Sequence, residues 1–112
     1  MKVAISATGK DMDSTIDPGF GRTTYFLIVD TKSGDIVQVI DNSAAQNAGG
    51  GAGINAATIV SGSGAQVVLT GQVGPKASEI LHAGGIKVIL NVRGTVGEAV
   101  ELYKKGAISS SD

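Results

Sequence analysis

Five short apolar segments, each ended by glycine or polar residues, restrict this chain to a small α/β fold. Each segment has about the length of an ordinary β-strand and lies between turn-forming residues. The second and third are joined by a turn at Lys32–Asp35, which predicts a β-hairpin. The five predicted strands are Lys2–Ala7, Thr24–Asp30, Ile36–Ile40, Gln66–Thr70 and Ile86–Leu90.

Two further segments have helical patterns. From Ala52 onward, Ile54, Ala57 and the pair Ile59 and Val60 can share one face of a helix, which residues 61–64 then end. A second helix is predicted to begin at 74–76 (Gly-Pro-Lys), because proline is favoured at the first helical position, and to end at the two glycines 84–85.

A third predicted helix has the clearest boundaries. Thr95 and Glu98 have the Thr-x-x-Glu spacing of a capping box, in which the two side chains bond to each other's backbone. Apolar residues then recur at 96, 99, 100 and 103, as in an amphipathic helix. Lys104 and Lys105 suit the negative end of the helix dipole, and Gly106 is expected just beyond its end.

The predicted order is therefore β-β-β-α-β-α-β-α, which we assign to the α/β class. Right-handed crossovers make the later strands parallel, whereas the hairpin adds an antiparallel strand. We expect a five-stranded mixed sheet with helices on both faces. The length fits a single domain over residues 1–106, with a short C-terminal tail at 107–112.

The composition excludes several classes of function. There is no cysteine, so disulfides, thiolate metal ligands and thiol catalysis are absent. The net charge of −1 gives no support for binding nucleic acid. We expect a cytoplasmic protein without membrane association, because the first residues do not form a signal peptide and no apolar run reaches the length of a membrane span.

The glycines indicate where a ligand could bind. The chain has 17 of them, about twice the average share, and they gather at 49–53, at 71 and 74, and at 94 and 97. Each group precedes a predicted helix, whose first N–H groups are unpaired and carry a partial positive charge. With Lys76 and Arg93 beside these turns and few acidic residues in the middle of the chain, the pattern predicts an anion site made mostly from backbone.

Other kinds of site are poorly supported. The chain lacks a P-loop motif, and its glycines do not form the full dinucleotide fingerprint. His82 is the only histidine and is expected on the surface or near a helix end, so a tight site for a bare transition-metal ion is not predicted. Asp11, Asp13 and Asp17 lack the spacing of a calcium loop and are interpreted as a solvated acidic loop. No serine has the Asp–His support of a catalytic triad.

Several motifs, taken in order along almost the whole chain, resemble one known family. They are Phe20-Gly21-Arg22 before the strand 25–30, Gly-Gly-Gly-Ala-Gly at 49–53, Gly-Pro-Lys-Ala at 74–77, Gly-Ile-Lys-Val at 85–88 and Gly-Thr-Val at 94–96. This ordered set is similar to the dinitrogenase iron–molybdenum cofactor biosynthesis family, which contains nitrogenase accessory factors. Within it, the chain looks closest to the orange-protein subgroup.

The resemblance implies a ribonuclease H-like fold and a role in carrying a metal–sulfur cofactor. Relatives often have a histidine before Phe-Gly-Arg, but Gly19 takes that place here, which argues against a histidine ligand. The orange-protein subgroup implies a non-covalently held molybdenum–copper sulfide cluster, and the wider family an iron–molybdenum–sulfur precursor. A protein partner for delivery of the cluster is a further implication.

Together these arguments predict a non-catalytic carrier of an anionic metal–sulfur cluster. Sulfide already saturates the metals of such a cluster, so the protein need supply only shape, charge and N–H donors. The residues expected to surround it are Arg22, Gly50, Gly51, Gly53, Gly74, Lys76 and Arg93. The main alternative is a protein-interaction adaptor without metal cargo. A nuclease ranks last, because Asp30, at a strand end, is the one carboxylate suitably placed for metal-dependent cleavage.

Overall fold

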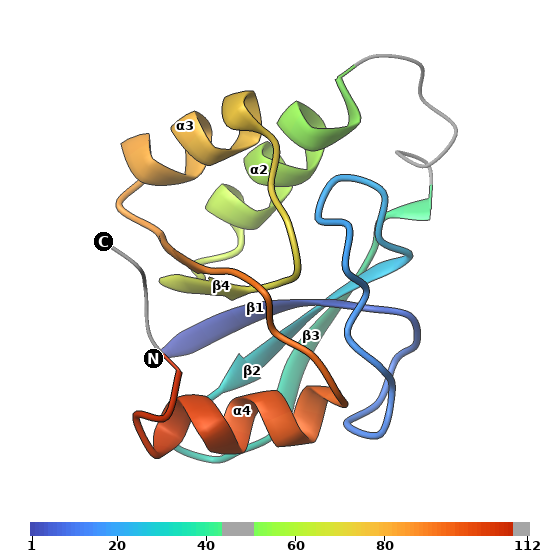
Figure 1. Cartoon of the computed structure of the whole chain (residues 1–112), viewed down its shortest axis with the longest axis vertical. Helices are drawn as coiled ribbons and strands as arrows, with labels where there is room; N and C mark the ends of the chain where they lie inside the picture. The colour runs from blue at the N-terminus through green and yellow to red at the C-terminus, as the bar shows by residue number, and fades with distance from the viewer. Residues whose placement is uncertain (44–50, 109–112) are drawn as a thin grey trace.

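The computed structural model describes residues 1–43 and 51–108 and has alternating strands and helices after an initial hairpin (Figure 1). Strand and helix boundaries lie within a residue or two of those expected from the sequence. The elements are β1 (Lys2–Ala7), β2 (Tyr25–Asp30), β3 (Ile36–Asp41), α2 (Ala52–Gly62), β4 (Val67–Leu69), α3 (Pro75–Ala83), β5 (Lys87–Ile89) and α4 (Val96–Lys104).

The strands form one five-stranded sheet in the order β3-β2-β1-β4-β5. A five-stranded sheet with both parallel and antiparallel strands was predicted, whereas the order was not. β1 and β3 each pair antiparallel with β2, whereas β4 pairs parallel with both β1 and β5. The carboxyl ends of β1, β4 and β5 therefore lie at one edge of the sheet. In open α/β sheets, this is the edge at which ligands bind.

Alternate side chains of the strands point to opposite faces, and each face has its own apolar core. Val3 and Ile5 of β1 belong to the core under α4, whereas Ala4 belongs to the core under α2 and α3. Figure 1 shows the same division, with α2 and α3 on one side of the sheet and α4 on the other. The predicted arrangement of helices on both faces is confirmed.

The buried face of α2 differs from the prediction. Ile54 and Ile59 are 37% and 39% exposed, and the helix packs instead through small residues, with Ala56 and Ala57 fully buried. A Cβ atom built on Gly53 would lie 3.5 Å from the Cβ of Ala77 in α3. The prediction was right for Ala57 and Val60, which are fully buried, and wrong for Ile54 and Ile59, because close packing between α2 and α3 favours small side chains over large ones.

The ends of α4 agree with the sequence in detail. The backbone N–H of Thr95 donates to Glu98 Oε1 at 2.9 Å, and the N–H of Glu98 donates to Thr95 Oγ1 at 3.2 Å. Beyond the helix, Gly106 has a φ of 73° and donates to the carbonyl of Tyr103. Both the capping box and the terminal glycine are confirmed.

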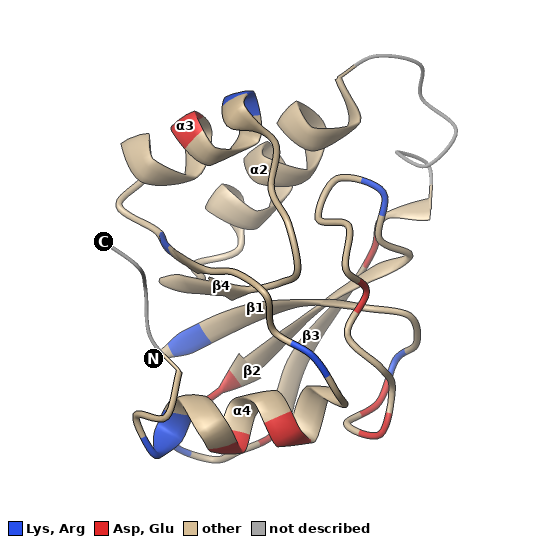
Figure 2. Ribbon diagram, in the orientation of Figure 1, with Lys and Arg blue, Asp and Glu red and all other residues tan. Residues whose placement is uncertain are grey.

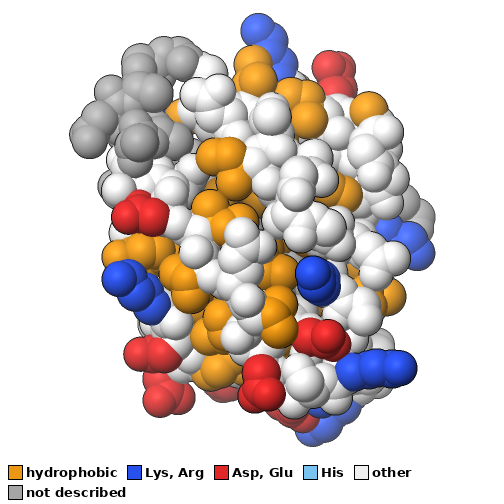
Figure 3. All heavy atoms as spheres, turned by 180° about the vertical axis from the view of Figure 1, so that it is seen from behind, with side chains coloured by type: hydrophobic (Ala, Val, Ile, Leu, Met, Phe, Trp, Pro, Cys, Tyr) orange, Lys and Arg blue, Asp and Glu red, His pale blue; other side chains and the backbone are white. Residues whose placement is uncertain are grey.

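The side seen from behind is partly apolar, with exposed apolar side chains interspersed among polar ones from its upper to its lower part (Figure 3). Val37 and Val39 of the edge strand β3 are among the exposed apolar residues, at 51% and 42%. Within the described part of the chain, no helix is long and apolar enough to cross a membrane.

Candidate functional site

The turn at residues 20–22 lies directly against the beginning of α2. Phe20 anchors the turn, since it is 1% exposed and its ring lies 5.0 Å from that of Phe26. A Cβ atom built on Gly21 would lie only 2.9 Å from the Cα and N atoms of Gly53. Only glycine at position 21 allows the two backbones to approach so closely.

A second contact joins this loop to the connection between β4 and α3. The N–H of Gln72 donates to the carbonyl of Pro18 at 2.8 Å, and the N–H of Phe20 donates to the carbonyl of Gln72 at 3.2 Å. A Cβ atom built on Gly71 would lie 2.7 Å from the Cα of Pro18. The loop before β2 is therefore held between the starts of α2 and α3.

These contacts form an open cavity of about 500 Å³ where the three segments meet. A neighbouring depression of about 400 Å³ shares Gly51, Gly53 and Gly74 with it and adds Lys76. The lining of the first cavity comes from the 19–22 turn, the start of α2 and the 72–74 segment: Gly19, Phe20, Gly21, Arg22, Gly51, Ala52, Gly53, Gln72, Val73 and Gly74.

The first residues of α2 and of α3 both line this region. The residues before them, Gly51 and Gly74, have no side chain, and neither helix has a side-chain hydrogen bond at its start. Neither helix has an acidic residue in its first turn. Two helix ends with positive partial charge therefore face one region, as required for binding an anion through backbone N–H groups.

Gly74 has no structural reason to be glycine. Its φ is −69° and its ψ is 162°, values that any residue can adopt, and a Cβ atom built there would meet nothing within 4 Å. Gly51, in contrast, has a φ of 87°, which favours glycine. Without a side chain at position 74, the main chain stays open to the cavity, which allows a ligand to approach it closely.

The charges near the cavity favour an anion. Arg22 lines the cavity, Lys76 lines the neighbouring depression, and no Asp or Glu lines either. Asp17 contacts the edge of the cavity through the backbone, since its Oδ1 accepts a hydrogen bond from the N–H of Gly19 at 3.1 Å. In Figure 2, acidic residues gather on α4 and on the loop after β1.

The start of α4 does not contribute to this site, contrary to the expectation that three helix starts combine. Its first N–H groups are already used, because Val96 donates to the carbonyl of Ser14 and Gly97 to that of Met12, each at 2.9 Å. The N–H of Thr95, the largest cause, and the Thr95 hydroxyl lower the pKa of the Glu98 carboxyl below its ordinary value. An ionised carboxylate therefore occupies the positive end of α4.

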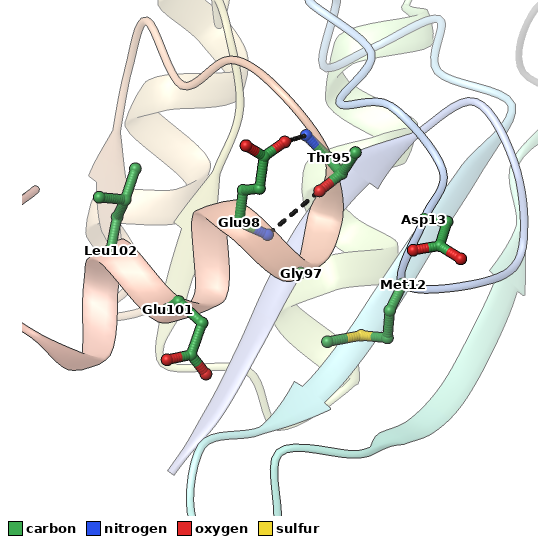
Figure 4. A pocket seen from close by; sticks show the side chains of 7 residues that line it. All are labelled: Met12, Asp13, Thr95, Gly97, Glu98, Glu101 and Leu102. Carbon is green, nitrogen blue, oxygen red and sulfur yellow. Dashed lines mark hydrogen bonds between the residues drawn. The ribbon is translucent and has the colours of Figure 1, made fainter.

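A separate concave region lies beside this helix (Figure 4). It is lined by Met12 and Leu102 together with the carboxylates of Asp13, Glu98 and Glu101. Figure 4 shows the Met12 side chain between the carboxylates of Asp13 and Glu101. Its acidic rim makes this region unsuitable for an anion.

The residues predicted for the site are therefore only partly brought together. Arg22, Gly51, Gly53 and Gly74 line one cavity, and Lys76 lines the adjoining depression. Arg93 lies in the connection between β5 and α4 and lines neither, because α4 covers the opposite face of the sheet. The stretch from Asp41 to Gly50 lacks periodicity and predicts an irregular loop. Gly50 and the other residues at 44–50 lie outside the described residues.

Two functional candidates were missed at the sequence level. Thr23 and Asn42 are buried polar residues at 0% and 1% exposure. The Thr23 hydroxyl donates to the carbonyls of Ala7 and Tyr25, and the Asn42 amide donates to the carbonyls of Gly21 and Thr23 on either side of Arg22. The signal available in the sequence was the lack of periodicity after residue 41, which was assigned to a loop as a whole.

His82 is exposed, as expected, and the described part of the chain contains no group of three or more His, Asp or Glu residues placed to hold a metal ion.

Comparison with known proteins gives a consistent result. A family model described as dinitrogenase iron-molybdenum cofactor matches residues 1–106. The apo form of the orange protein from Desulfovibrio gigas is 41% identical and superimposes with a TM-score of 0.93, over 98% of this chain and 92% of that one. A Thermotoga protein solved by NMR is 34% identical, with a TM-score of 0.81 over 97% and 91% of the two chains. An uncharacterized protein of Methanocaldococcus jannaschii is 27% identical over 96% of this chain and 93% of its own.

Proposed function

The chain belongs to the dinitrogenase iron-molybdenum cofactor family, and we propose that it is a non-catalytic carrier of an anionic metal–sulfur cluster. The cargo is a molybdenum–copper sulfide cluster, with an iron–molybdenum–sulfur precursor as the other cargo that the family implies. It binds without covalent attachment over the cavity between the 19–22 turn and the starts of α2 and α3. Family membership and similarity to the orange protein support a cofactor-related role.

The observation that carries the proposal is the convergence of two helix starts without side-chain caps on one cavity without acidic lining residues. Backbone N–H groups there can donate to the sulfides of a cluster. Gly53 and Gly74 allow the cluster to approach the main chain closely. Arg22 and Lys76 add positive charge without needing to coordinate metal.

The same lining explains why we propose a carrier and not an enzyme. Among the residues lining the two depressions there is no carboxylate, imidazole or thiol that could act as a general base or a nucleophile. The arrangement provides shape, positive charge and N–H donors, which are properties of a binding site. We assign to Arg93 only a long-range electrostatic contribution to cluster binding, because it lines neither depression.

Reconstitution tests the proposal. The protein is mixed with tetrathiomolybdate and copper, desalted, and examined for its visible spectrum and metal content. We expect retained colour with molybdenum and copper in a fixed ratio, and amide shifts at residues 51–54 and 74–77. A colourless product without these shifts would reject the molybdenum–copper cargo.

The contribution of positive charge to cluster binding has its own test. Lys76→Ala removes a charge beside the cavity, whereas Lys87→Ala removes an exposed charge at the start of β5. We expect Lys76→Ala to weaken binding at low ionic strength, with the difference shrinking as salt is added, because salt screens exposed charges. Equal affinities for the two variants at every salt concentration would show that Lys76 does not contribute.

A protein-interaction adaptor remains the second candidate because β3 is at one edge of the described sheet and has exposed Val37 and Val39. Such an edge can accept a strand from another protein. Substitution of these valines by threonine should leave cluster retention unchanged if the protein is a carrier. A protein that never retains metal but binds a partner through this edge would favour the adaptor.

A further inference from the structure

Asn42 connects the end of β3 to the turn that carries Arg22. Its side chain is 1% exposed, and Nδ2 donates to the carbonyl of Gly21 at 3.2 Å and to that of Thr23 at 3.0 Å. Its backbone N–H donates to the carbonyl of Thr24 at 2.9 Å. One residue therefore makes three hydrogen bonds to the segment 21–24.

The two side-chain bonds lie on either side of Arg22, so they fix the backbone from which its guanidinium group extends. The side chain of Thr23 is also held in place, because its Oγ1 donates to the carbonyls of Ala7 and Tyr25, each at 3.1 Å. Gly21 in turn lies against Gly53 with no room for a methyl group. The position of this turn relative to α2 therefore sets the shape of one wall of the cavity.

The two ends of the Asn42 amide differ in their hydrogen bonding. Its Oδ1 is buried and has no hydrogen-bond partner among the described residues. A buried carbonyl oxygen without a partner destabilises the folded state. The side-chain hydrogen bonds of Asn42 within the described part of the chain are those of its NH₂ group, to the carbonyls of Gly21 and Thr23.

We infer that Asn42 is a positioning residue for the cluster cavity, which it shapes by holding the carbonyls of Gly21 and Thr23. The inference rests on the proposed function, and it assigns to Asn42 no contact with the cargo. Loss of the NH₂ group frees the turn from β3. Arg22 and Gly21 then no longer lie at a fixed distance from the start of α2, and the cluster loses part of its preformed site.

Two substitutions of similar size test this role. Asn42→Asp keeps the shape but replaces the NH₂ donor with an oxygen, and Asn42→Leu removes both polar atoms. The matched control is Val100→Ala, which creates a cavity in the core under α4, on the opposite face of the sheet. The control lowers stability without touching the turn.

The first readout needs no cargo. We expect the amide signals of residues 21–23 to shift and to become more mobile in both Asn42 variants and to stay unchanged in Val100→Ala. In Asn42→Asp the signals should return toward those of the unmodified protein as the pH falls, because the protonated carboxyl regains one donor. The unmodified protein is titrated in parallel. Unchanged amides in both Asn42 variants would overturn the inference.

The second readout is the affinity for copper with tetrathiomolybdate, measured by absorbance titration. We expect both Asn42 variants to bind about tenfold more weakly, the effect of losing roughly one well-placed interaction, and Val100→Ala to bind normally. Normal affinity despite a mobile turn would also overturn the inference. If the unmodified protein retains no cluster, the proposed function fails, and the amide signals alone then decide whether Asn42 holds the turn.

Discussion

Replacing Gly74 with alanine should separate ligand binding from stability. Position 74 has φ and ψ values that alanine adopts easily, and a Cβ atom there would meet nothing within 4 Å. Such a change from glycine stabilises a protein by about 0.4–1 kcal/mol, because it restricts the unfolded chain. We therefore expect the free energy of unfolding of Gly74→Ala to rise slightly.

The affinity for the cluster should move in the opposite direction. The added methyl group stands at the edge of the cavity, where it separates the cluster sulfides from the first N–H groups of α3. Loss of one such interaction corresponds to about tenfold weaker binding, or about 1.4 kcal/mol. Urea unfolding measures the first effect, and absorbance titration with tetrathiomolybdate and copper measures the second.

Gly62→Ala is the matched control. Gly62 is the last residue of α2, has no neighbour within 4 Å of a built Cβ atom and lines neither depression. It should gain stability in the same way, without a change in affinity. If Gly74→Ala binds as tightly as Gly62→Ala, the start of α3 does not contact the cargo. If Gly74→Ala is less stable than the unmodified protein, our account of the free space at this position is wrong.

Three further predictions concern the packing and the ends of the helices. Gly21→Ala should lower the free energy of unfolding by about 1–3 kcal/mol, because its methyl group would meet the backbone of Gly53 at 2.9 Å; a midpoint of urea unfolding like that of the unmodified protein would contradict this. Thr95→Ala should cost about 1 kcal/mol through loss of the capping box and leave cluster affinity unchanged, since α4 lies on the other face; weaker binding would contradict the separation of α4 from the site. Glu98 has a lowered pKa in the folded protein, so the stability it contributes is present above its ordinary value of 4.5 and is lost as the pH falls through the folded pKa. Glu98→Gln should therefore show a smaller loss of thermal stability than the unmodified protein between about pH 5 and pH 3, and identical acid profiles would refute this.

The fold was largely predictable where the signals are local. The capping box needs only Thr95 and Glu98, and the start of α3 needs only proline at its first position, so both appear in the sequence and in the structure. The strand predicted over Lys2–Ala7 is present as well, and its geometry divides Val3, Ala4 and Ile5 between the two cores. The ribonuclease H-like assignment and the domain boundary at residue 106 stay predictions.

The buried face of α2 was only partly predictable from its own pattern, which placed Ala57 and Val60 correctly. Ile54 and Ile59 are the largest apolar residues in that helix, and by hydrophobicity they should be inside. They are exposed because α3, which follows in sequence, approaches α2 near Gly53 and selects its small side chains. Information from a distant segment overrides local periodicity here.

The candidate site was predictable as a set of glycines but not as a spatial arrangement. Gly53 and Gly74 were identified because they precede helices, and the structure places both at one cavity. Arg93 also precedes a helix, but which face of the sheet α4 would cover cannot be read from its sequence pattern. Asn42 was missed because its importance comes from carbonyl groups some twenty residues earlier in the chain.

Because of the contact between Gly21 and Gly53, the cavity wall resists inward and outward movement in different ways. The two backbones already lie so close that not even a methyl group fits between them, so the wall resists compression. Movement away from contact is opposed by hydrogen bonds, those from Asn42 to the turn and those between the loop and Gln72. Steric contact thus resists narrowing, whereas hydrogen bonds resist widening. If the protein carries a cluster as proposed, we expect it to discriminate more sharply against a smaller cluster than against a larger one.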